Sequence, residues 1–170
     1  MSKREEILDI AERGYRTGGF SGISYRDIAA ELGIKSASIH YHFPHKEDLG
    51  KAVVERYADN FIDSLGAPDS NNDVISDRVT RLANAYRNAF ADAKASCLCA
   101  VLGSVSPQLP SKVQKAVRVF FDRLLDWTQK ATEKPSPELI AMLQGAMILS
   151  VATDDPNHLD QVISKIREEY

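Results

Sequence analysis

Residues 32–46 read Leu-Gly-Ile-Lys-Ser-Ala-Ser-Ile-His-Tyr-His-Phe-Pro-His-Lys, without an acidic residue. One helical pattern ends at Gly33, and a shorter one begins at Ser36 and stops before Pro44, so the stretch predicts two helices joined by a tight turn. Gly33 suits the left-handed conformation that ends the first helix, and Ile34 fills the corner between the two. This spacing is typical of a helix-turn-helix, and the lack of acidic residues favours contact with an anion.

The two predicted helices have distinct inner and outer faces. Ser24 precedes the first helix and Asp27 follows three residues later, a variant of the capping box that satisfies free amides at a helix start. In the second helix, Ile39 and Phe43 lie four residues apart and face inward. The opposite face carries side chains that are small, hydroxylated or aromatic: Ala37, Ser38 and Tyr41. Such a face suits the major groove of DNA, because short side chains allow close approach and hydroxyls bond to bases or phosphates.

The composition is that of an ordinary globular protein, with 170 residues, of which 44% are apolar and 26% charged. A net charge of −3 argues against a nonspecific polybasic binder. The charges are unevenly distributed, because residues 1–56 hold nine basic and nine acidic residues and the acid-free stretch stands out within this neutral segment. That pattern is expected when only one face meets phosphate.

Two longer stretches carry a resemblance to a known family. Residues 23–29 read Ile-Ser-Tyr-Arg-Asp-Ile-Ala, and residues 39–49 read Ile-His-Tyr-His-Phe-Pro-His-Lys-Glu-Asp-Leu. Together with an N-terminal helix that ends in Gly-Gly-Phe at residues 18–20, these stretches resemble the DNA-binding domain of TetR/AcrR-type transcriptional repressors. The resemblance covers roughly residues 3–53. It implies a ligand-responsive transcriptional repressor.

The rest of the chain has a helical pattern throughout, and no run of alternating residues reads as a strand. Together with the resemblance, this predicts an all-α fold of about nine helices. We expect a three-helix, helix-turn-helix DNA-binding domain at residues 1–46 and a helical ligand-binding and dimerisation domain at residues 47–170. A helix from Glu47 to about Leu65 is expected to link the two domains.

The resemblance implies a partner, double-stranded operator DNA, and the residues that contact it. Arg26 occupies a base-contacting position, and Tyr25 occupies a phosphate-contacting one. His40 stands where the family usually has tyrosine. The groove-facing positions hold Ser36, Ala37, Ser38, His40 and Tyr41. Further phosphate contacts fall on His42 and Lys46.

In the family that the sequence resembles, the C-terminal helices usually enclose a small apolar effector. Aromatic and sulfur-containing side chains in this part of the chain would line such a pocket, although aromatic residues at helical spacing more often form a plain core. No cofactor is expected. The expected ligand-binding residues are Tyr57, Phe61, Tyr86, Phe90, Cys97, Phe120, Phe121, Trp127 and Met142.

The last two helices predict assembly into a homodimer. Residues 139–151 are apolar on nearly every side of a helix, and such a helix must be covered on more than one face. A two-fold interface of four helices would cover it together with the final helix, and the resemblance implies the same arrangement. The alternative is that residues 142–149 are simply the core of the second domain. The expected interface residues are Leu139, Leu143, Met147, Leu159, Val162, Ile163 and Ile166.

Cys97 and Cys99 are the only cysteines. Residues two apart on a helix point about 200° away from each other, so a disulfide between them would require local unwinding. Buried thiols are therefore the favoured interpretation, and a repressor that senses oxidants or electrophiles through these thiols is the alternative. No metal site is expected, because only His158 lies outside the DNA-binding domain to join the pair.

Other classes of protein explain less of the sequence. An enzyme is disfavoured because three of the four histidines, His40, His42 and His45, lie on the expected DNA face. A helical interaction protein that does not bind DNA would explain the apolar C-terminal helices but not Arg26 or Lys46. The charged N-terminus shows no targeting segment, and the longest apolar stretch falls short of the roughly 20 residues that a membrane span needs. A cytoplasmic protein that does not enter a membrane is expected.

Overall fold

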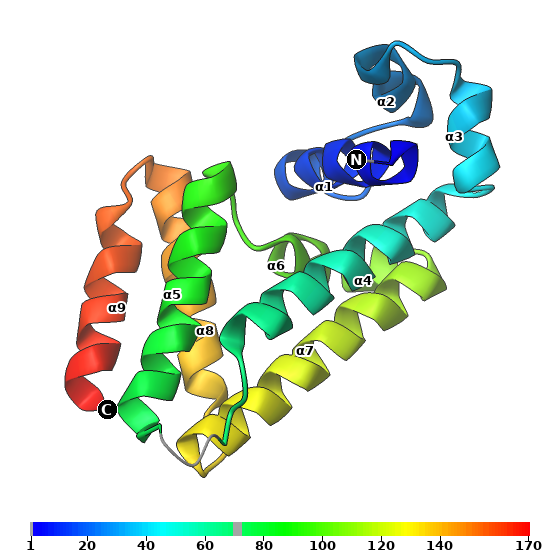
Figure 1. The fold of residues 1–170 in the computed structure, drawn as a ribbon. Coiled ribbons are helices and arrows are strands. Elements are labelled where there is room, and N and C mark those ends of the chain that lie inside the picture. Colours follow the sequence, from blue (N-terminus) through cyan, green and yellow to red (C-terminus); the bar gives the residue numbers. More distant parts are fainter. Residues whose placement is uncertain (1, 70–72) are drawn as a thin grey trace. The chain divides into compact units, whose positions relative to one another are not determined.

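The structure is a computed structural model that describes residues 2–69 and 73–170. Within these ranges the chain forms nine α-helices and one short 3₁₀ helix, and no strand (Figure 1). The predicted all-α fold class is confirmed. The elements in chain order are α1 (Lys3–Gly18), α2 (Tyr25–Leu32), α3 (Ser36–His42), α4 (Lys46–Leu65), α5 (Ile75–Ala93), α6 (Leu98–Gly103), η1 (Ser106–Gln108), α7 (Ser111–Thr132), α8 (Pro137–Thr153) and α9 (Asn157–Glu169).

The helices pack as two compact units, each built from separate segments of the chain. The first unit comprises Met1–Ala58 and Leu98–Phe120, and the second comprises Asp59–Cys97 and Phe121–Tyr170. These units differ from the single division that we expected after residue 46. α4 has 20 residues and α7 has 22, and a helix of that length spans about 30 Å, which is long enough to contribute to two cores. Both helices therefore belong partly to each unit.

The start and end of α2 follow from its sequence. The side chain of Ser24 accepts a hydrogen bond from the backbone N–H of Asp27, and Asp27 accepts one in return from the backbone N–H of Ser24 at 2.9 Å. At the other end, Gly33 has a φ of 63°, and its N–H donates to the carbonyls that α2 leaves free. Ile28 and Ile39 are fully buried in this unit. The capping box and the left-handed glycine that the sequence predicted are both confirmed.

An ion-pair cluster around Arg56 ties α4 to α1 within the first unit. The guanidinium donates to Asp9 at 2.7 Å, to Glu12 at 3.0 Å and to Glu5 at 3.2 Å, and the arginine side chain is only 20% exposed. Nearby, the Lys112 ammonium at the start of α7 pairs with Asp48 at 2.7 Å. These contacts fix the start of α4, directly after the helix-turn-helix.

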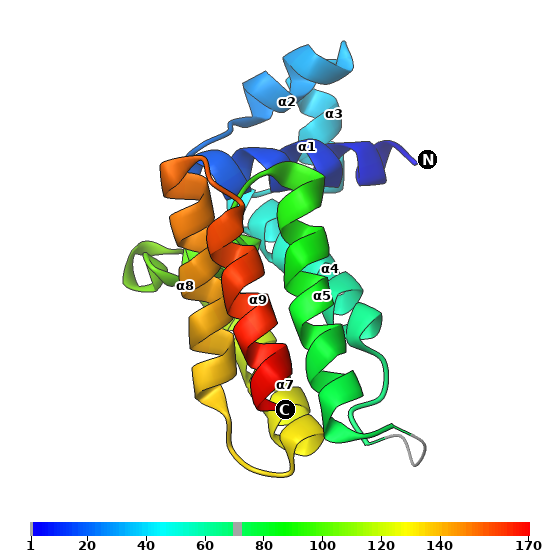
Figure 2. The ribbon, with the colours of Figure 1, turned by 90° about the vertical axis from the view of Figure 1, so that its left-hand side faces the viewer.

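The second unit is built around α5, α8 and α9, which lie side by side (Figure 2). Arg87 on α5 pairs with Asp160 on α9 at 2.7 Å, and Arg167 donates to Asn84 at 2.8 Å. The indole N–H of Trp127 donates to the carbonyl of Gly66 at 2.8 Å, where α4 has just ended. Polar contacts at its edges thus supplement the apolar core of this unit.

Two helices in the described ranges are long and partly apolar. No single helix there is both long and apolar enough to cross a membrane, and α7 and α8 reach that threshold only when taken together, with a bend of 119° between them.

Candidate nucleic-acid interface and ligand pocket

The outward face of α3 is an exposed surface that follows a tight turn. α2 and α3 pack against each other, and α3 turns Ile39 inward, where the side chain is fully buried. Tyr41 lies on the opposite side, 85% exposed. The predicted groove-facing residues Ala37, Ser38 and His40 are also exposed, and Ser36 is partly exposed. The face is therefore free to approach a partner, and it carries no carboxylate.

Tyr25 has a role that sequence reasoning missed. Its hydroxyl donates to the backbone carbonyl of Phe43 at 2.8 Å, so it ties the start of α2 to the residue that follows α3. Its ring also meets the ring of His40 edge-on, with the centroids 4.7 Å apart. Burial raises the pKa of Tyr25 to about 12, and the nearby charge of Asp48 adds to this shift. If Tyr25 contacts a phosphate as expected, its hydroxyl must serve both that phosphate and the carbonyl of Phe43.

The basic and imidazole groups of the predicted interface sit at the ends of α2 and α3 and at the start of α4. Arg26 is exposed in the first turn of α2. The His42 ring lies edge-on to that of Tyr41, with centroids 5.3 Å apart. The Lys46 ammonium lies over the Phe20 ring, 5.1 Å from its centroid, and partial burial lowers the pKa of this lysine. The aromatic ring restrains where Lys46 can point.

The predicted ligand-binding residues divide between the two units. Tyr57 and Phe120 belong to the first unit, with ring centroids 6.0 Å apart, and the other predicted residues belong to the second. Phe61 and Tyr86 are neighbours in the second unit, at 5.3 Å. Six of the predicted side chains are buried: Tyr57, Phe61, Tyr86, Cys97, Phe120 and Trp127. Phe90, Phe121 and Met142 are partly exposed.

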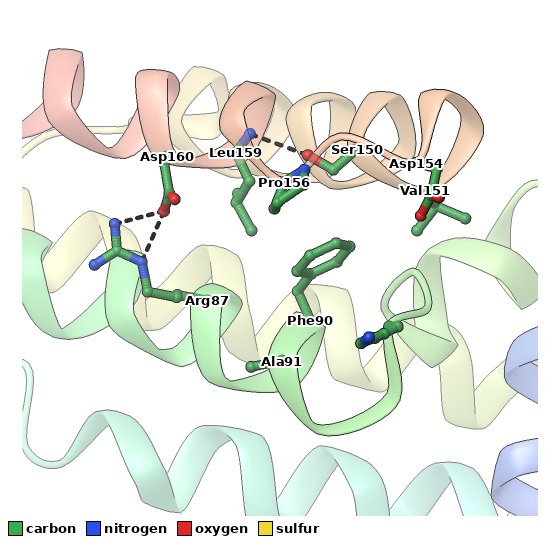
Figure 3. A pocket seen from close by; sticks show the side chains of 10 residues that line it. Arg87, Phe90, Ala91, Ser150, Val151, Asp154, Pro156, Leu159 and Asp160 are labelled. Carbon is green, nitrogen blue, oxygen red and sulfur yellow. Dashed lines mark hydrogen bonds and ion pairs between the residues drawn. The ribbon is translucent and has the colours of Figure 1, made fainter.

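A pocket of about 710 Å³ opens in the second unit, between the end of α5 and the turn from α8 to α9 (Figure 3). Of the predicted ligand-binding residues it includes Phe90 alone, whose ring stands in the middle of the view. The Arg87–Asp160 ion pair closes one side. The lining residues are Arg87, Phe90, Ala91, Lys94, Ser150, Val151, Asp154, Pro156, Leu159 and Asp160.

Sequence reasoning missed the pocket because its walls are helix ends rather than an aromatic stripe. Lys94 and Asp154 end α5 and α8 in the left-handed conformation, with φ of 44° and 53°. The hydroxyl of Ser150 accepts from the N–H of Leu159 at 3.1 Å and so fixes the turn between α8 and α9. The run Asp154-Asp155-Pro156 was the only signal of this turn in the sequence.

The residues expected at a dimer interface lie mostly inside the chain itself. Leu139, Leu143, Met147, Leu159, Ile163 and Ile166 are each no more than 1% exposed, and Val162 is partly exposed. This differs from the expectation, because α8 turns Leu139, Leu143 and Met147 towards the core of its own chain, and α9 does the same with Leu159, Ile163 and Ile166. The large apolar side chains that α8 leaves exposed are instead Ile148 at 50%, Leu149 at 54% and Val151 at 41%. The alternative, that residues 142–149 form the core of the second domain, agrees with the burial of Leu143 and Met147 but not with the exposure of Ile148 and Leu149.

Both cysteines are buried. Cys97 and Cys99 are 0% exposed and belong to different units, and the backbone N–H of Cys97 approaches the sulfur of Met147 at 3.2 Å. Burial agrees with the favoured interpretation of these thiols. In the described part of the chain, no group of three or more histidine, cysteine or acidic residues is placed to hold a metal ion.

The fold and the exposed α3 define an all-helical protein with an N-terminal helix-turn-helix and a further helical unit. Comparison with known proteins specifies it further. Residues 7–53 match the model of the bacterial regulatory proteins of the tetR family. A TetR transcriptional regulator from Legionella pneumophila has the same fold, with a TM-score of 0.90 and 28% identity over 99% of this chain and 97% of that one. The chain is thus similar to TetR-type transcriptional regulators over nearly its whole length, and residues 7–53 match the family's own model.

Two further proteins show the same similarity. A TetR-family regulator from Agrobacterium tumefaciens is 28% identical, covers 98% of this chain and 96% of that one, and has a TM-score of 0.89. The negative transcriptional regulator IcaR of the icaADBC biofilm operon in Staphylococcus epidermidis is 34% identical over 62 residues, which are 36% of this chain and 34% of IcaR. The chain thus spans about a third of the length of the curated relatives that it matches.

Two tyrosine variants should distinguish a side chain that holds α3 in place from one that is only exposed on α3. Tyr25→Phe removes the hydroxyl that donates to Phe43 and should lower the free energy of unfolding by about 0.5–1.5 kcal/mol. Tyr41→Ala removes a side chain that is 85% exposed and should change it by less than about 0.5 kcal/mol. Urea unfolding followed by circular dichroism measures both. A Tyr25→Phe variant as stable as the wild type would mean that this bond does not hold α3.

Proposed function

We propose that the protein is a sequence-specific DNA-binding transcriptional repressor that a small effector releases from its operator. The observation that carries this proposal is the exposed, carboxylate-free face of α3, presented by a tight turn after α2. A helix of this kind fits the major groove, where short and hydroxylated side chains reach base edges. The proteins that share the fold are transcriptional regulators, which supports the same conclusion.

The proposed contacts fall into two groups with different consequences. Arg26 and the exposed residues of α3 read bases, whereas His42 and Lys46 contact phosphates. The arginine fork matches the two acceptors of guanine, so Arg26 carries sequence information. Lys46 is a single positive charge steadied by the Phe20 ring, so it contributes affinity to any sequence.

The first test compares Arg26→Ala with Lys46→Ala on DNA. Arg26→Ala should cost about 1–3 kcal/mol and relax specificity at one operator position. Lys46→Ala should weaken all duplexes similarly and reduce the slope of log affinity against log salt by about one. Fluorescence anisotropy with duplexes selected from a random library measures both effects. Unchanged affinity in both variants and in Tyr41→Ala would remove α3 as the DNA-reading element.

We propose that the repressor works as a homodimer in the cytoplasm, with the outer face of α8 at the interface. Ile148 and Leu149 are about half exposed in the single chain, and covering them would remove a large apolar surface from water. A Cβ added at Gly145 on α8 would meet no atom within 4 Å, so a second helix has room to approach closely there. Two copies related by a two-fold axis would then present two recognition helices to two half-sites.

Charged substitutions on α8 should test the dimer. The double variant Ile148→Glu with Leu149→Glu should stay folded but become monomeric, because these side chains are exposed within the chain. Its operator affinity should fall steeply, since one recognition helix cannot replace two. Val119→Glu is the matched control, because Val119 is 45% exposed on α7 and should leave assembly unchanged. Sedimentation measures the mass; a wild type that is monomeric at micromolar concentration would refute the dimer.

We propose that the pocket around Phe90 holds the effector. Its volume of about 710 Å³ lies within the range of small-molecule sites, and it joins apolar walls to a few charged groups. The remaining predicted ligand-binding residues are largely buried, and they serve as core unless an effector separates them. A thiol-based sensor is the less supported route, because both cysteines are fully buried.

Effector binding should follow the rule of reciprocity. A small molecule selected because it raises the Tm of the protein should weaken DNA binding by the same factor by which DNA weakens its own binding. Phe90→Arg should remove the small-molecule response and retain DNA binding, because the new side chain fills the pocket. Calorimetric titration with and without duplex measures this. If Met142→Ala loses the response and Phe90→Arg keeps it, the effector site lies among the predicted aromatic residues instead.

A further inference from the structure

His40 is held in one orientation on the exposed face of α3. Its ring meets Tyr25 edge-on at 4.7 Å, with an angle of 67° between the planes, and its Nδ1 lies 3.4 Å from the carbonyl oxygen of Pro44. Tyr25 is itself fixed by its hydrogen bond to Phe43. One ring nitrogen of His40 thus faces the protein backbone, while the side chain remains exposed. The other nitrogen, Nε2, is left for a partner.

The contact with Pro44 decides which nitrogen carries the hydrogen. A backbone carbonyl can only accept, so Nδ1 must be the donor. Neutral imidazole has a single N–H, and Nε2 is therefore a bare acceptor in the neutral form. Guanine and phosphate offer only acceptor atoms to this position, so a bond to either requires a proton on Nε2. A histidine free to change tautomer would avoid that requirement.

The charged groups around this corner are already engaged within the protein. Asp48 on α4, whose charge reaches Tyr25, is already bound by Lys112 and by the backbone N–H of His45. Asp27 on α2 is engaged in the capping box and lies near the cations Arg26 and Lys46. Tyr15 on α1 and Tyr25 are neutral at physiological pH, because burial raises the pKa of both. DNA phosphates would supply the negative charge that these groups do not.

We propose that His40 is a DNA-contacting residue whose contact with DNA is coupled to proton uptake. On binding, Nε2 takes one proton from solvent and donates it in a hydrogen bond to an acceptor atom of guanine or phosphate. The bond from Nδ1 to Pro44 is retained. Operator affinity therefore rises as pH falls from 8 to 6, the range in which imidazole changes its charge. This inference rests on the proposed function, and it specifies the chemistry of one of the proposed contacts with DNA.

The test measures DNA affinity against pH in histidine variants. A random duplex library is selected on the full chain at pH 8.0 and at pH 6.0, and the affinity of the selected duplex is measured at both values at constant salt. The wild type should bind on the order of tenfold more tightly at pH 6.0. His40→Gln, which cannot take up a proton, should bind with nearly equal affinity at the two values. His45→Gln and the distant His158→Gln should keep the pH dependence.

The outcomes separate this inference from the proposed function. If neither selection enriches a duplex, the DNA-binding proposal fails. If a duplex is enriched but wild-type affinity does not change with pH, or if His40→Gln keeps the full dependence, DNA binding stands and the role of His40 is wrong. Two modified duplexes then identify the acceptor. Loss of the pH-dependent gain on replacing one guanine by 7-deazaguanine indicates a base contact, and its loss on replacing one phosphate by methylphosphonate indicates a backbone contact.

Discussion

The cluster in which Arg56 meets three carboxylates of α1 holds the DNA-facing unit together. The acids lie at positions 5, 9 and 12, which is one face of a helix, and all three reach a single guanidinium within 3.2 Å. A pair exposed to water contributes little, but Arg56 is 20% exposed and its partners form a network, which makes each bond depend on the others. α3 is followed closely by α4, so this cluster also helps to hold the proposed recognition helix in place relative to α1.

Within the first unit, α3 has a face without acidic residues and α1 has a face rich in them, and the two faces serve different purposes. Carboxylates lie beside the partly buried guanidinium of Arg56, and they are absent from the face where they would repel a phosphate. Asp48 and Asp27 lie beside the proposed DNA-contacting residues, and each is engaged: the hydrogen bond from Lys112 lowers the pKa of Asp48, and the hydrogen bonds from Ser24 lower that of Asp27. Both carboxylates therefore remain ionised and bound at neutral pH.

Local features of the sequence were sufficient to predict α2 and α3, but not the use of their side chains. The capping box at Ser24 and the left-handed Gly33 are decided by residues within four positions of each other, so the sequence reveals them directly. The hydrogen bond from Tyr25 to Phe43 spans 18 residues, and the partners of Arg56 are 44 to 51 residues away. Contacts of that kind depend on how helices pack, which periodicity does not specify.

The same reason explains why the proposed dimer interface uses other residues of α8 than the sequence predicted. A helix that is apolar on every side gives no indication of which side its own chain covers, and only the positions of α5 and α9 decide that Met147 points inward and Leu149 outward. The second unit likewise could not be delimited from sequence, because a break in a helical pattern marks the end of a helix and not the edge of a core. The segment Leu98–Phe120 packs with the N-terminal helices although it lies about 40 residues beyond them in the chain.

α4 is the helix through which the proposed effector would act, because it belongs to both units. Its first half is bound to α1 through Arg56 and to the start of α7 through Lys112, and just beyond its C-terminus the carbonyl of Gly66 accepts from Trp127 in the second unit. A displacement of α4 that preserved the Arg56 cluster would carry α1 with it, and the helix-turn-helix would move as one body. Breaking the cluster instead would leave a partly buried guanidinium without its partners, which costs more than the 1–3 kcal/mol typical of coupling between sites. Rigid movement of the first unit would therefore be the less costly response to the proposed effector.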